Sequence, residues 1–556
     1  MSFLFGSSRG YDRSWLRGDL IAGLTVWAVL VPESLAYATI AGVSPVVGLY
    51  AAPGALLLYA AFGSSRHLVT GPMAATAALS AAVVADFATA GSDAFLAFTV
   101  ALALAVALCA LVAGVLRLGF LANFISEPVL KGFIIGLALT IIVGQLPKLF
   151  GIEKTEGDFF EQLVGFLRGI GGLDVPTLVI GLISLVIVIG LKEIAPVVPG
   201  SLIAVIFGIA AVTLLDLDAQ GVAVVGPIQG GLPTFGLPDV APADFFGIVA
   251  GALGVALVGF VEGLGAAKIY AARNHYDIDP DREMLGLGAA NLASGLAGGM
   301  VVNGSLSKTA VNGGAGAHSQ VSGLVVAALV VVTLLFLTAL FEPLPEATLA
   351  AIVIAALVEL VDIRTLVGYY RLTTSRLGRV YGAAARPDFL AATAALLGVL
   401  LFDTLPGLFI GIVVSIVLLV YRASRPHVAD VGRLPGTDRF VDRDRHPDAD
   451  VPPGVAILRP ESELFFANAD RIRRAILDAA TSGVTAVILD LETVPSIDLT
   501  ATTMLREVGE TLAGRGVRLI IARDIGQVRD ILRLDEKAAT SVYATVEEAV
   551  RAVSPP

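Results

Sequence analysis

The stretch Asn303-Gly304-Ser305-Leu306-Ser307-Lys308 interrupts a long series of apolar runs, and Thr70-Gly71-Pro72 interrupts the same series nearer its start. Irregular backbone at membrane depth persists only where it lines a cavity or is buried in protein. Proline at the first helical position and serine at a cap are both signals of a helix start. Each interruption therefore predicts a helix that begins inside a membrane.

The runs around these breaks indicate a polytopic membrane protein. Of the 556 residues, 56% are hydrophobic and only 15% are charged, whereas soluble proteins carry about 25% charge. Runs of about 20 apolar residues, each long enough for a hydrocarbon core of ~30 Å, continue to Tyr421. We predict a transmembrane domain over residues 1–421. Its expected spans are 20–41, 44–63, 72–90, 94–116, 121–146, 175–192, 196–215, 244–268, 284–302, 305–316, 318–341, 346–361, 386–403 and 405–421, with an amphipathic interfacial segment near 156–170.

The placement of basic residues predicts the orientation of the fourteen spans. If the N-terminus is inside, the connections from even to odd spans should be basic. They hold Arg66, Arg117, Lys192, Lys268 and a cluster of arginines over residues 364–386. The opposite stretch, residues 214–244, has no Lys or Arg. We therefore expect a multi-pass protein of the cytoplasmic membrane with both termini in the cytoplasm.

A second domain follows the last span. Residues 422–451 are rich in Arg, Asp and Pro and are predicted to form a linker. Residues 452–556 have ordinary soluble composition. Their apolar segments at Gly454–Leu458, Ala486–Leu491 and Arg518–Ala522 alternate with amphipathic ones, which is typical of an α/β domain.

Corresponding positions recur at a near-constant distance along the transmembrane part. Gly71 and Ser305 are 234 residues apart, and Glu33 and Glu262 are 229 residues apart. This offset predicts an inverted repeat of seven plus seven spans. A pair of broken helices in corresponding halves is the best sequence indication of a transporter binding site.

The two breaks also predict what is bound. Each helix N-terminus carries roughly half a positive charge and free backbone N–H groups, so two facing termini form a cradle for an anion. Lys308 adds a full positive charge. Inserting a lone Lys at the bilayer centre costs ~3 kcal/mol, so its presence there suggests a function. The alternative is a lysine that reaches an interface or forms a purely structural ion pair. The residues predicted to contact the anion at the breaks are Thr70, Gly71, Pro72, Ser305, Ser307 and Lys308.

Two acidic residues lie in apolar helices near these breaks. Glu262 is a candidate for binding a coupling proton or sodium ion, because a desolvated carboxylate attracts a cation. Its alternative role is a buried ion pair, for which Lys308 is the candidate partner. Glu33 follows Pro32, and Glu33 and Tyr37 share a helix face because they are four residues apart. Both are predicted to face the anion, although a structural role for Glu33 is equally open.

Several function classes are not supported by the sequence. Cys109 is the single cysteine, and the five histidines form no pair at ligand spacing, so we expect no metal site. Residues 304–309 lack the Gly before Lys that a phosphate loop requires, which leaves ATP-driven transport unsupported. The net charge of -11 contains no block that indicates nucleic-acid binding. We expect a protein that is not an enzyme and has no cofactor beyond a coupling ion.

Four segments together resemble the sulfate permease (SulP) family of anion transporters, and the resemblance runs along nearly the whole chain. They are DLIAGLTVWAVLVPESLAYATIAGVSPVVGLYAA (19–52), GSSRHLVTGPMA (63–74), VGFVEGLGAAKIYA (258–271) and GSLSKTAVNGGAGAHSQVSGL (304–324). The resemblance implies a fourteen-span inverted repeat similar to the uracil permease. It also implies a core of spans 1–4 and 8–11 that moves in an elevator-like way against a gate of spans 5–7 and 12–14. The substrate would lie between the starts of spans 3 and 10, and a homodimer is expected.

Two departures leave the substrate open. Many relatives have Gln where this chain has Glu33, and many have Arg where it has Lys308. Glu33 in place of Gln adds a possible negative charge. Lys308 in place of Arg replaces a planar guanidinium with the point charge of an ammonium group. Sulfate, bicarbonate and dicarboxylates all remain candidate substrates.

The C-terminal domain resembles a STAS domain, with VILDLETVPSIDLTATTML (487–505) as the turn that enters a helix. In bacterial sigma-factor regulators of that fold, a Ser or Thr at this turn is phosphorylated. Asp498 and Thr500 occupy the matching places and are candidate regulatory residues, and a cytoplasmic partner is expected. The favoured alternative is that Asp498 only caps the helix.

We therefore expect secondary transport of a small anion by symport with a cation. An uncoupled anion channel, an anion exchanger and a nucleobase permease of similar fold are the alternatives among transport proteins. A membrane-tethered sensor that signals through its STAS domain is the alternative from another class.

Overall fold

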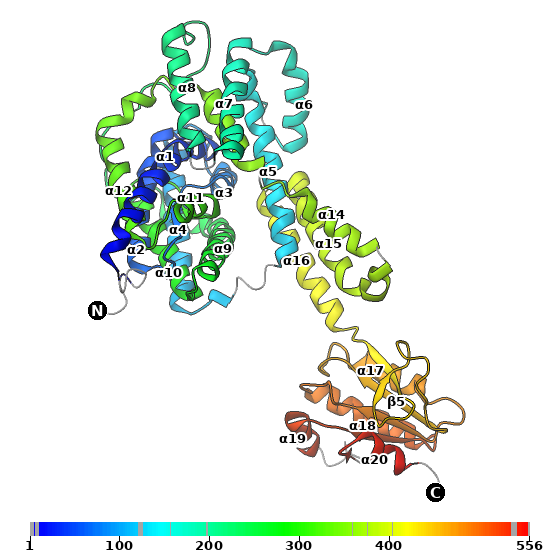
Figure 1. The fold of residues 1–556 in the computed structure, drawn as a ribbon. Coiled ribbons are helices and arrows are strands. Elements are labelled where there is room, and N and C mark those ends of the chain that lie inside the picture. The colour runs from blue at the N-terminus through cyan, green and yellow to red at the C-terminus, as the bar shows by residue number, and fades with distance from the viewer. Residues whose placement is uncertain are drawn as a thin grey trace. The chain divides into compact units, whose positions relative to one another are not determined.

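The computed structural model describes residues 5, 11–120, 126–155, 157–195, 198–228, 230–358, 360–374, 376–402, 404–534 and 542–553 (Figure 1). The chain divides into two compact units, Met1–Ser415 and Ile416–Pro556.

Helices make up most of the first unit, because a chain in hydrocarbon must satisfy its backbone hydrogen bonds within each segment. The elements of its first half are α1 (Leu16–Ile40), α2 (Pro45–Phe62), β1 (Val69–Gly71), α3 (Ala74–Ala85), α4 (Asp93–Val115), α5 (Glu127–Phe150), α6 (Phe159–Gly169), α7 (Val175–Ile194) and α8 (Gly200–Leu215). Those of its second half are α9 (Pro242–Arg273), α10 (Pro280–Leu296), β2 (Asn303–Ser305), α11 (Leu306–Gly314), α12 (Val321–Val332), α13 (Glu346–Val358), α14 (Ile363–Thr374), α15 (Arg376–Phe402) and α16 (Thr404–Ala423).

The described helices follow the apolar pattern of the sequence closely. A helix lies in every range where the sequence predicts a span. In the described part of the chain, seven helices are long and apolar enough to cross a membrane: Arg13–Ile40, Pro45–Phe62, Asp93–Val115, Glu127–Phe150, Val175–Ile194, Pro242–Arg273 and Val321–Phe341. The amphipathic segment near 156–170 is α6, which begins with a capping box between Asp158 and Glu161. Helix α14 is additional, because the apolar pattern does not predict it.

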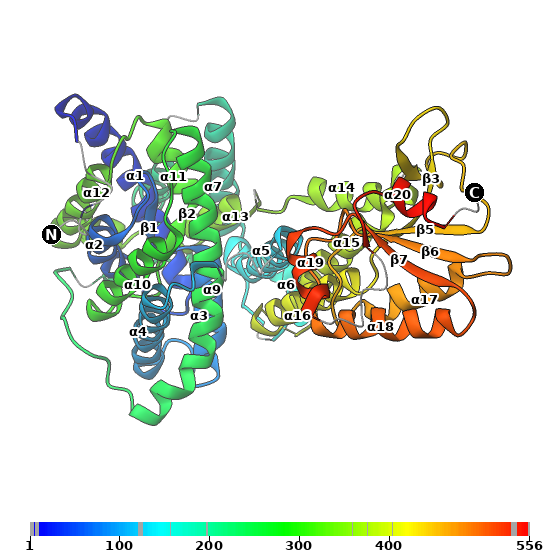
Figure 2. The same ribbon diagram turned by 90° about the horizontal axis from the view of Figure 1, so that it is seen from below.

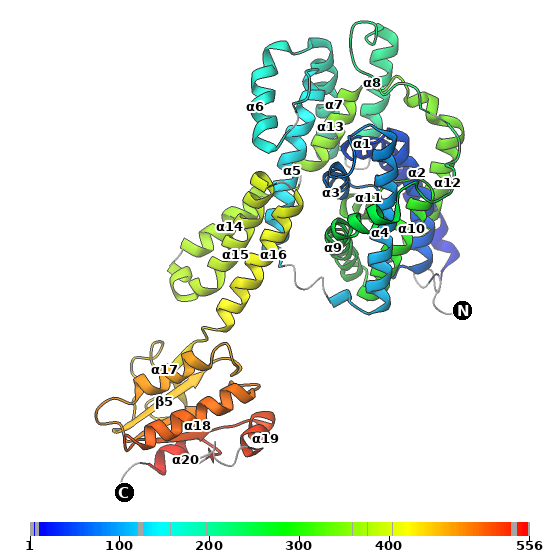
Figure 3. The same cartoon turned by 180° about the vertical axis from the view of Figure 1, so that it is seen from behind.

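The helices of the first unit pack in two groups. Helices α1, α2, α4, α9, α10, α11 and α12 pack on one another, and α5 packs on α13 and α15 (Figures 1 and 3). Contacts of α1 with α8 and α13, and of α3 with α5, join the groups.

Small residues set how closely these helices approach. A Cβ on Gly48 of α2 would lie 2.0 Å from the Ser34 carbonyl oxygen of α1. A Cβ on Gly132 of α5 would lie 2.0 Å from the Ala392 carbonyl oxygen of α15. Such contacts are typical of membrane helices, whose association relies on close backbone packing.

The second unit is an α/β domain with one six-stranded sheet in the order β4-β3-β5-β6-β7-β8. Strands β5, β6, β7 and β8 are parallel to one another, and β3 pairs antiparallel with β4 and β5. The strands are β3 (Val428–Arg433), β4 (Phe440–Asp442), β5 (Val455–Pro460), β6 (Ala486–Asp490), β7 (Arg518–Ala522) and β8 (Val542–Tyr543). The helices are α17 (Ala469–Ala479), α18 (Leu499–Ala513), α19 (Gly526–Leu534) and α20 (Val546–Arg551).

Alternating side chains give this sheet two cores. Val487 and Leu489 of β6 pack with residues of α17 and α18, whereas Ile488 packs with residues of α20 on the other face. Figure 2 shows α17 and α18 on one face of the sheet and α20 on the opposite face. Because side chains alternate between two buried faces, β6 is apolar from Ala486 to Leu489.

The sheet begins earlier than the sequence suggests. Residues 422–451 are predicted to be a linker, but β3 and β4 lie within this range and pair with the sheet. Val431 of β3 is fully buried among the side chains of the α20 core. Short strands among Arg, Asp and Pro residues give no alternating signal that sequence analysis could detect.

This difference predicts where the soluble domain can be separated. A fragment of residues 424–556 should unfold cooperatively in urea. A fragment of residues 452–556 loses the pairing of β3 and the burial of Val431, worth about 1.5–3 kcal/mol for a Val side chain alone. We expect its free energy of unfolding, measured by circular dichroism, to be lower by at least ~2 kcal/mol.

In the longer fragment, Val431→Ala should lower the free energy of unfolding. Val542→Ala should leave it nearly unchanged, because the Val542 side chain is 42% exposed. Equal stability of the two fragments would show that β3 and β4 are dispensable.

Candidate functional site

The two breaks in the apolar pattern meet in a short strand pair. β1 and β2 are antiparallel, with Val69 opposite Ser305, Thr70 opposite Gly304 and Gly71 opposite Asn303. Because the strands are antiparallel, α3 and α11 leave the pair in opposite directions (Figure 2). The starts of two helices that are far apart in the sequence therefore lie together, as the sequence predicts.

The starts of these helices are capped differently. Ser305 is the N-cap of α11, and its Oγ accepts a hydrogen bond from the Lys308 backbone N–H at 3.3 Å. Thr309 Oγ1 donates to the Ser305 carbonyl oxygen at 2.5 Å and accepts from the Val69 N–H at 3.1 Å. α3 begins at Ala74, and its cap residue Met73 provides no side-chain hydrogen bond. Pro72 therefore lies before the helix and not at its first position, which corrects the sequence expectation.

Lys308 is buried at this junction and is only 1% exposed. Its Nζ lies 2.9 Å from Glu33 Oε2 of α1 and donates to the Pro72 carbonyl oxygen at 3.0 Å. The Tyr37 ring centroid is 4.9 Å from the same nitrogen, a cation–π contact. One ammonium group thus joins α1, the turn before α3, and α11.

The structure brings most of the predicted site residues together. Thr70 is fully buried, and its Oγ1 has no hydrogen-bond partner among the described residues. Gly71 is buried in the strand pair. Ser307 differs, because its side chain is exposed and its Oγ lies 3.1 Å from Ser305 Oγ. The role of these residues in binding stays a prediction.

Glu262 lies on α9 beside the strand pair. Its neighbour Gly263 packs closely on Gly304, since a Cβ on Gly304 would come within 3.0 Å of the Gly263 Cα. Glu262 Oε2 is buried, and no described residue forms a hydrogen bond with it. The ion pair with Lys308 considered as an alternative is not formed, because Lys308 pairs with Glu33.

Two further acids are buried more completely than Glu33 and were not identified from the sequence. Asp19 accepts hydrogen bonds from the Ser319 N–H and Oγ, and Glu283 accepts from the Tyr59 hydroxyl at 2.6 Å and the Ser64 hydroxyl at 2.7 Å. Both residues lie near the starts of helices, where the sequence alone suggests exposed capping residues. Their satisfied hydrogen bonds indicate that they join loops in the fold.

The candidate regulatory turn of the second unit has a structural explanation. Asp498 is the N-cap of α18, and its Oδ1 accepts from the Ala501 N–H at 2.8 Å. Its Oδ2 accepts from the Phe466 N–H, also at 2.8 Å. Thr500 is exposed. The capping role of Asp498 is therefore present, and regulation through Thr500 stays a prediction.

Residues 16–380 match the sulfate permease family, and residues 446–549 match the STAS domain. The chain belongs to the sulfate permease family. This family consists of transporters, and its multi-pass membrane architecture agrees with the apolar helices of the first unit.

Relatives within the sulfate permease family match almost the whole chain. A probable sulfate transporter of Mycobacterium tuberculosis is 36% identical, over 98% of this chain and 96% of the relative. High affinity sulfate transporter 1 of the plant Stylosanthes hamata is 30% identical, over 98% of this chain and 85% of the relative.

Solved structures show the same fold. The murine Solute Carrier 26 family member A9 anion transporter, in its inward-facing state, matches with a TM-score of 0.86 and 23% identity, over 98% of this chain and 92% of that one. The transmembrane domain of the cyanobacterial bicarbonate transporter BicA matches with a TM-score of 0.62 and 23% identity, over 71% of this chain and 98% of that one.

The Lys308–Glu33 pair predicts a specific pattern of stability. Lys308→Met leaves Glu33 buried without its partner, which should lower the stability of the purified protein by about 3–5 kcal/mol. Adding Glu33→Gln to Lys308→Met should recover much of this loss, because no uncompensated charge then remains. Thermal unfolding in detergent measures both effects.

Lys268→Met is the matched control, because Lys268 lies on α9 with an exposed side chain. Equal effects of Lys308→Met and Lys268→Met would show that the buried pair does not matter for stability.

Proposed function

We propose that this protein is a secondary active transporter of a small anion and that the anion binds at the junction of β1, β2 and the starts of α3 and α11. The observation that carries this proposal is the buried ammonium group of Lys308. A membrane protein retains such a charge at a high desolvation cost, and charged residues inside membranes are by default functional candidates. The first turn of α3, which lacks a side-chain cap, adds backbone N–H groups suited to an anion.

Glu33 makes anion binding conditional in this proposal. While Glu33 is ionised, it occupies Lys308 at 2.9 Å and repels an incoming anion. Release of Lys308 by Glu33 removes both obstacles and favours binding of the anion. Glu33 therefore acts both as a lining residue and as a competitor of the substrate, a role that a glutamine cannot perform.

Coupling to the ion gradient is assigned to Glu262. Its buried Oε2, which lacks a partner in the described structure, is suited to receive a proton or to contribute to a sodium site. Co-entry of a cation lowers the cost of moving an anion into a low-dielectric site. The proton is favoured over sodium, because Glu33 provides a second acid that can take it up.

The wider architecture supports an elevator-like mechanism. We assign fourteen spans in a seven-plus-seven inverted repeat, with both termini in the cytoplasm and two chains per assembly. The antiparallel pairing of β1 and β2 supports the inverted relation of the two halves. The packing of α5 on α13 and α15, and of α2 on α1 and α10, supports a gate and a core that move relative to one another.

Sulfate, bicarbonate and dicarboxylates are the proposed substrates. Named sulfate transporters are among the relatives, and a bicarbonate transporter shares the fold. The ammonium group of Lys308 is a compact point charge, whereas the planar guanidinium of an arginine binds an anion through two parallel hydrogen bonds. Lys308 therefore restricts the shape of the substrate less than an arginine does. The STAS domain is proposed to regulate transport through a cytoplasmic partner, with Asp498 and Thr500 at the turn that the partner recognises.

The proposal predicts the result of uptake measurements in proteoliposomes. At least one labelled anion from sulfate, bicarbonate and fumarate should accumulate against its gradient when a proton or sodium gradient is imposed. Glu262→Gln mimics the protonated state of Glu262. It should retain anion binding and exchange, but it should lose accumulation driven by the ion gradient.

Glu193→Gln is the matched control, because this carboxyl lies near the end of α7 with an exposed side chain. If Glu262→Gln accumulates the anion as the parent does, Glu262 is not the coupling site. If no anion accumulates under any gradient while all cross passively, the proposal of cation-coupled transport is wrong, and the protein is a channel or an uncoupled exchanger.

A further inference from the structure

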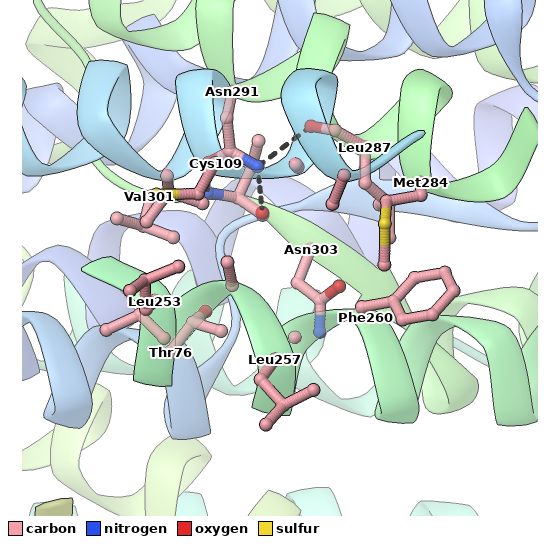
Figure 4. Close-up of a pocket in the computed structure, with 17 residues that line it drawn as sticks. Thr76, Cys109, Leu253, Leu257, Phe260, Met284, Leu287, Asn291, Val301 and Asn303 are labelled. Atoms are coloured by element: carbon pink, nitrogen blue, oxygen red, sulfur yellow. Dashed lines mark hydrogen bonds between the residues drawn. The ribbon is translucent and has the colours of Figure 1, made fainter. Parts of the chain in front are cut away.

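An apolar cavity lies beside the strand pair, and Asn303 of β2 is among its lining residues. Its volume is about 170 Å³, and its walls come from α3, α4, α9, α10 and β2. Figure 4 shows the lining side chains, most of which are aliphatic. Thr76 of the first turn of α3 and Asn303 of β2 are polar exceptions.

Asn303 places an unsatisfied donor in this cavity. The residue is only 1% exposed, and its Nδ2 has no hydrogen-bond partner among the residues described. Asn291, which also lines the cavity, has hydrogen-bond partners for its whole side-chain amide. It donates to the Leu287 and Val302 carbonyl oxygens and accepts from the Val302 N–H. Figure 4 shows the Asn303 amide nitrogen on the cavity side, above Leu257. A buried donor without an acceptor costs about 1–3 kcal/mol, which a suitable ligand would recover.

We propose that this cavity binds a small apolar molecule that carries one hydrogen-bond-accepting oxygen, with the oxygen at Asn303 Nδ2. The walls exclude ionic ligands, since they contain no charged side chain among the described lining residues. A lipid acyl tail would fill the apolar part but offers no acceptor to Asn303. The site is thus distinct in chemistry from the anion site at Lys308.

The ligand reaches the cavity from the hydrocarbon phase. Among the lining residues, Leu253 of α9 is 56% exposed, and Cys109 of α4 is half-buried. Both residues lie on apolar helices long enough to cross the membrane. Exposed leucines on such helices face lipid, so the opening between α4 and α9 faces lipid as well.

Cys109 allows a direct test, because it is the single cysteine of the chain and lines the cavity. The full-length protein in nanodiscs would be treated with N-ethylmaleimide, and the labelled fraction would be followed by intact-protein mass spectrometry. Heptan-2-one carries the required acceptor, and heptane is the matched molecule without it. At equal concentrations in the membrane, the half-protecting concentration of heptan-2-one should be about five-fold lower than that of heptane, the effect of one hydrogen bond.

Asn303→Ala should abolish the difference between the two probes, whereas Leu108→Ala, a 48% exposed neighbour of Cys109 that does not line the cavity, should preserve it. The comparison of probes on the unmodified protein remains decisive if Asn303→Ala does not fold. Equal protection by heptan-2-one and heptane, or protection by neither, would overturn the proposal and indicate a cavity that holds only lipid tails or water.

Discussion

A lysine ammonium group buried within a membrane protein must be neutralised, and the arrangement of the transport unit depends on how Lys308 is held. Its Nζ contacts Glu33 of α1 and the carbonyl oxygen of Pro72, and it lies over the ring of Tyr37. These contacts fix α1 against the starts of both broken helices. A buried pair of this kind stabilises little by itself, but removing one partner is severely destabilising. Loss of either partner is therefore expected to destabilise the junction.

We propose that an anion and the Glu33 carboxylate compete for Lys308. While the carboxylate contacts the ammonium group, the charge of Lys308 is satisfied internally. Once Glu33 releases Lys308, the ammonium group and the backbone N–H groups at the start of α3 are available to an anion. Glu262, on the neighbouring α9, is a second acid whose Oε2 is buried without a partner in the described chain. Glu262 is the acid that we propose to bind the coupling cation.

Much of this arrangement could be predicted from the sequence, because its strongest signals are apolar length and local breaks. The ranges of the helices, the meeting of the two breaks and the cap at Ser305 follow from those signals. Contacts between distant residues do not, and so the pairing of Lys308 with Glu33 in place of Glu262 required the structure. Asp19 and Glu283 were missed because acids at helix starts suggest exposed caps. The strands β3 and β4 were missed because their polar sequence resembles a linker.

The central claim is that an anion and ionised Glu33 compete for Lys308. The most direct test is the affinity of the purified protein for the transported anion, measured at one pH for the unmodified protein and for two variants. Glu33→Gln should bind the anion more tightly than the unmodified protein, because no carboxylate then competes for Lys308. Lys308→Ala should bind the anion more weakly by about 1–3 kcal/mol. A well-folded Glu33→Gln variant with weaker affinity than the unmodified protein, or full affinity in a well-folded Lys308→Ala variant, would contradict the account.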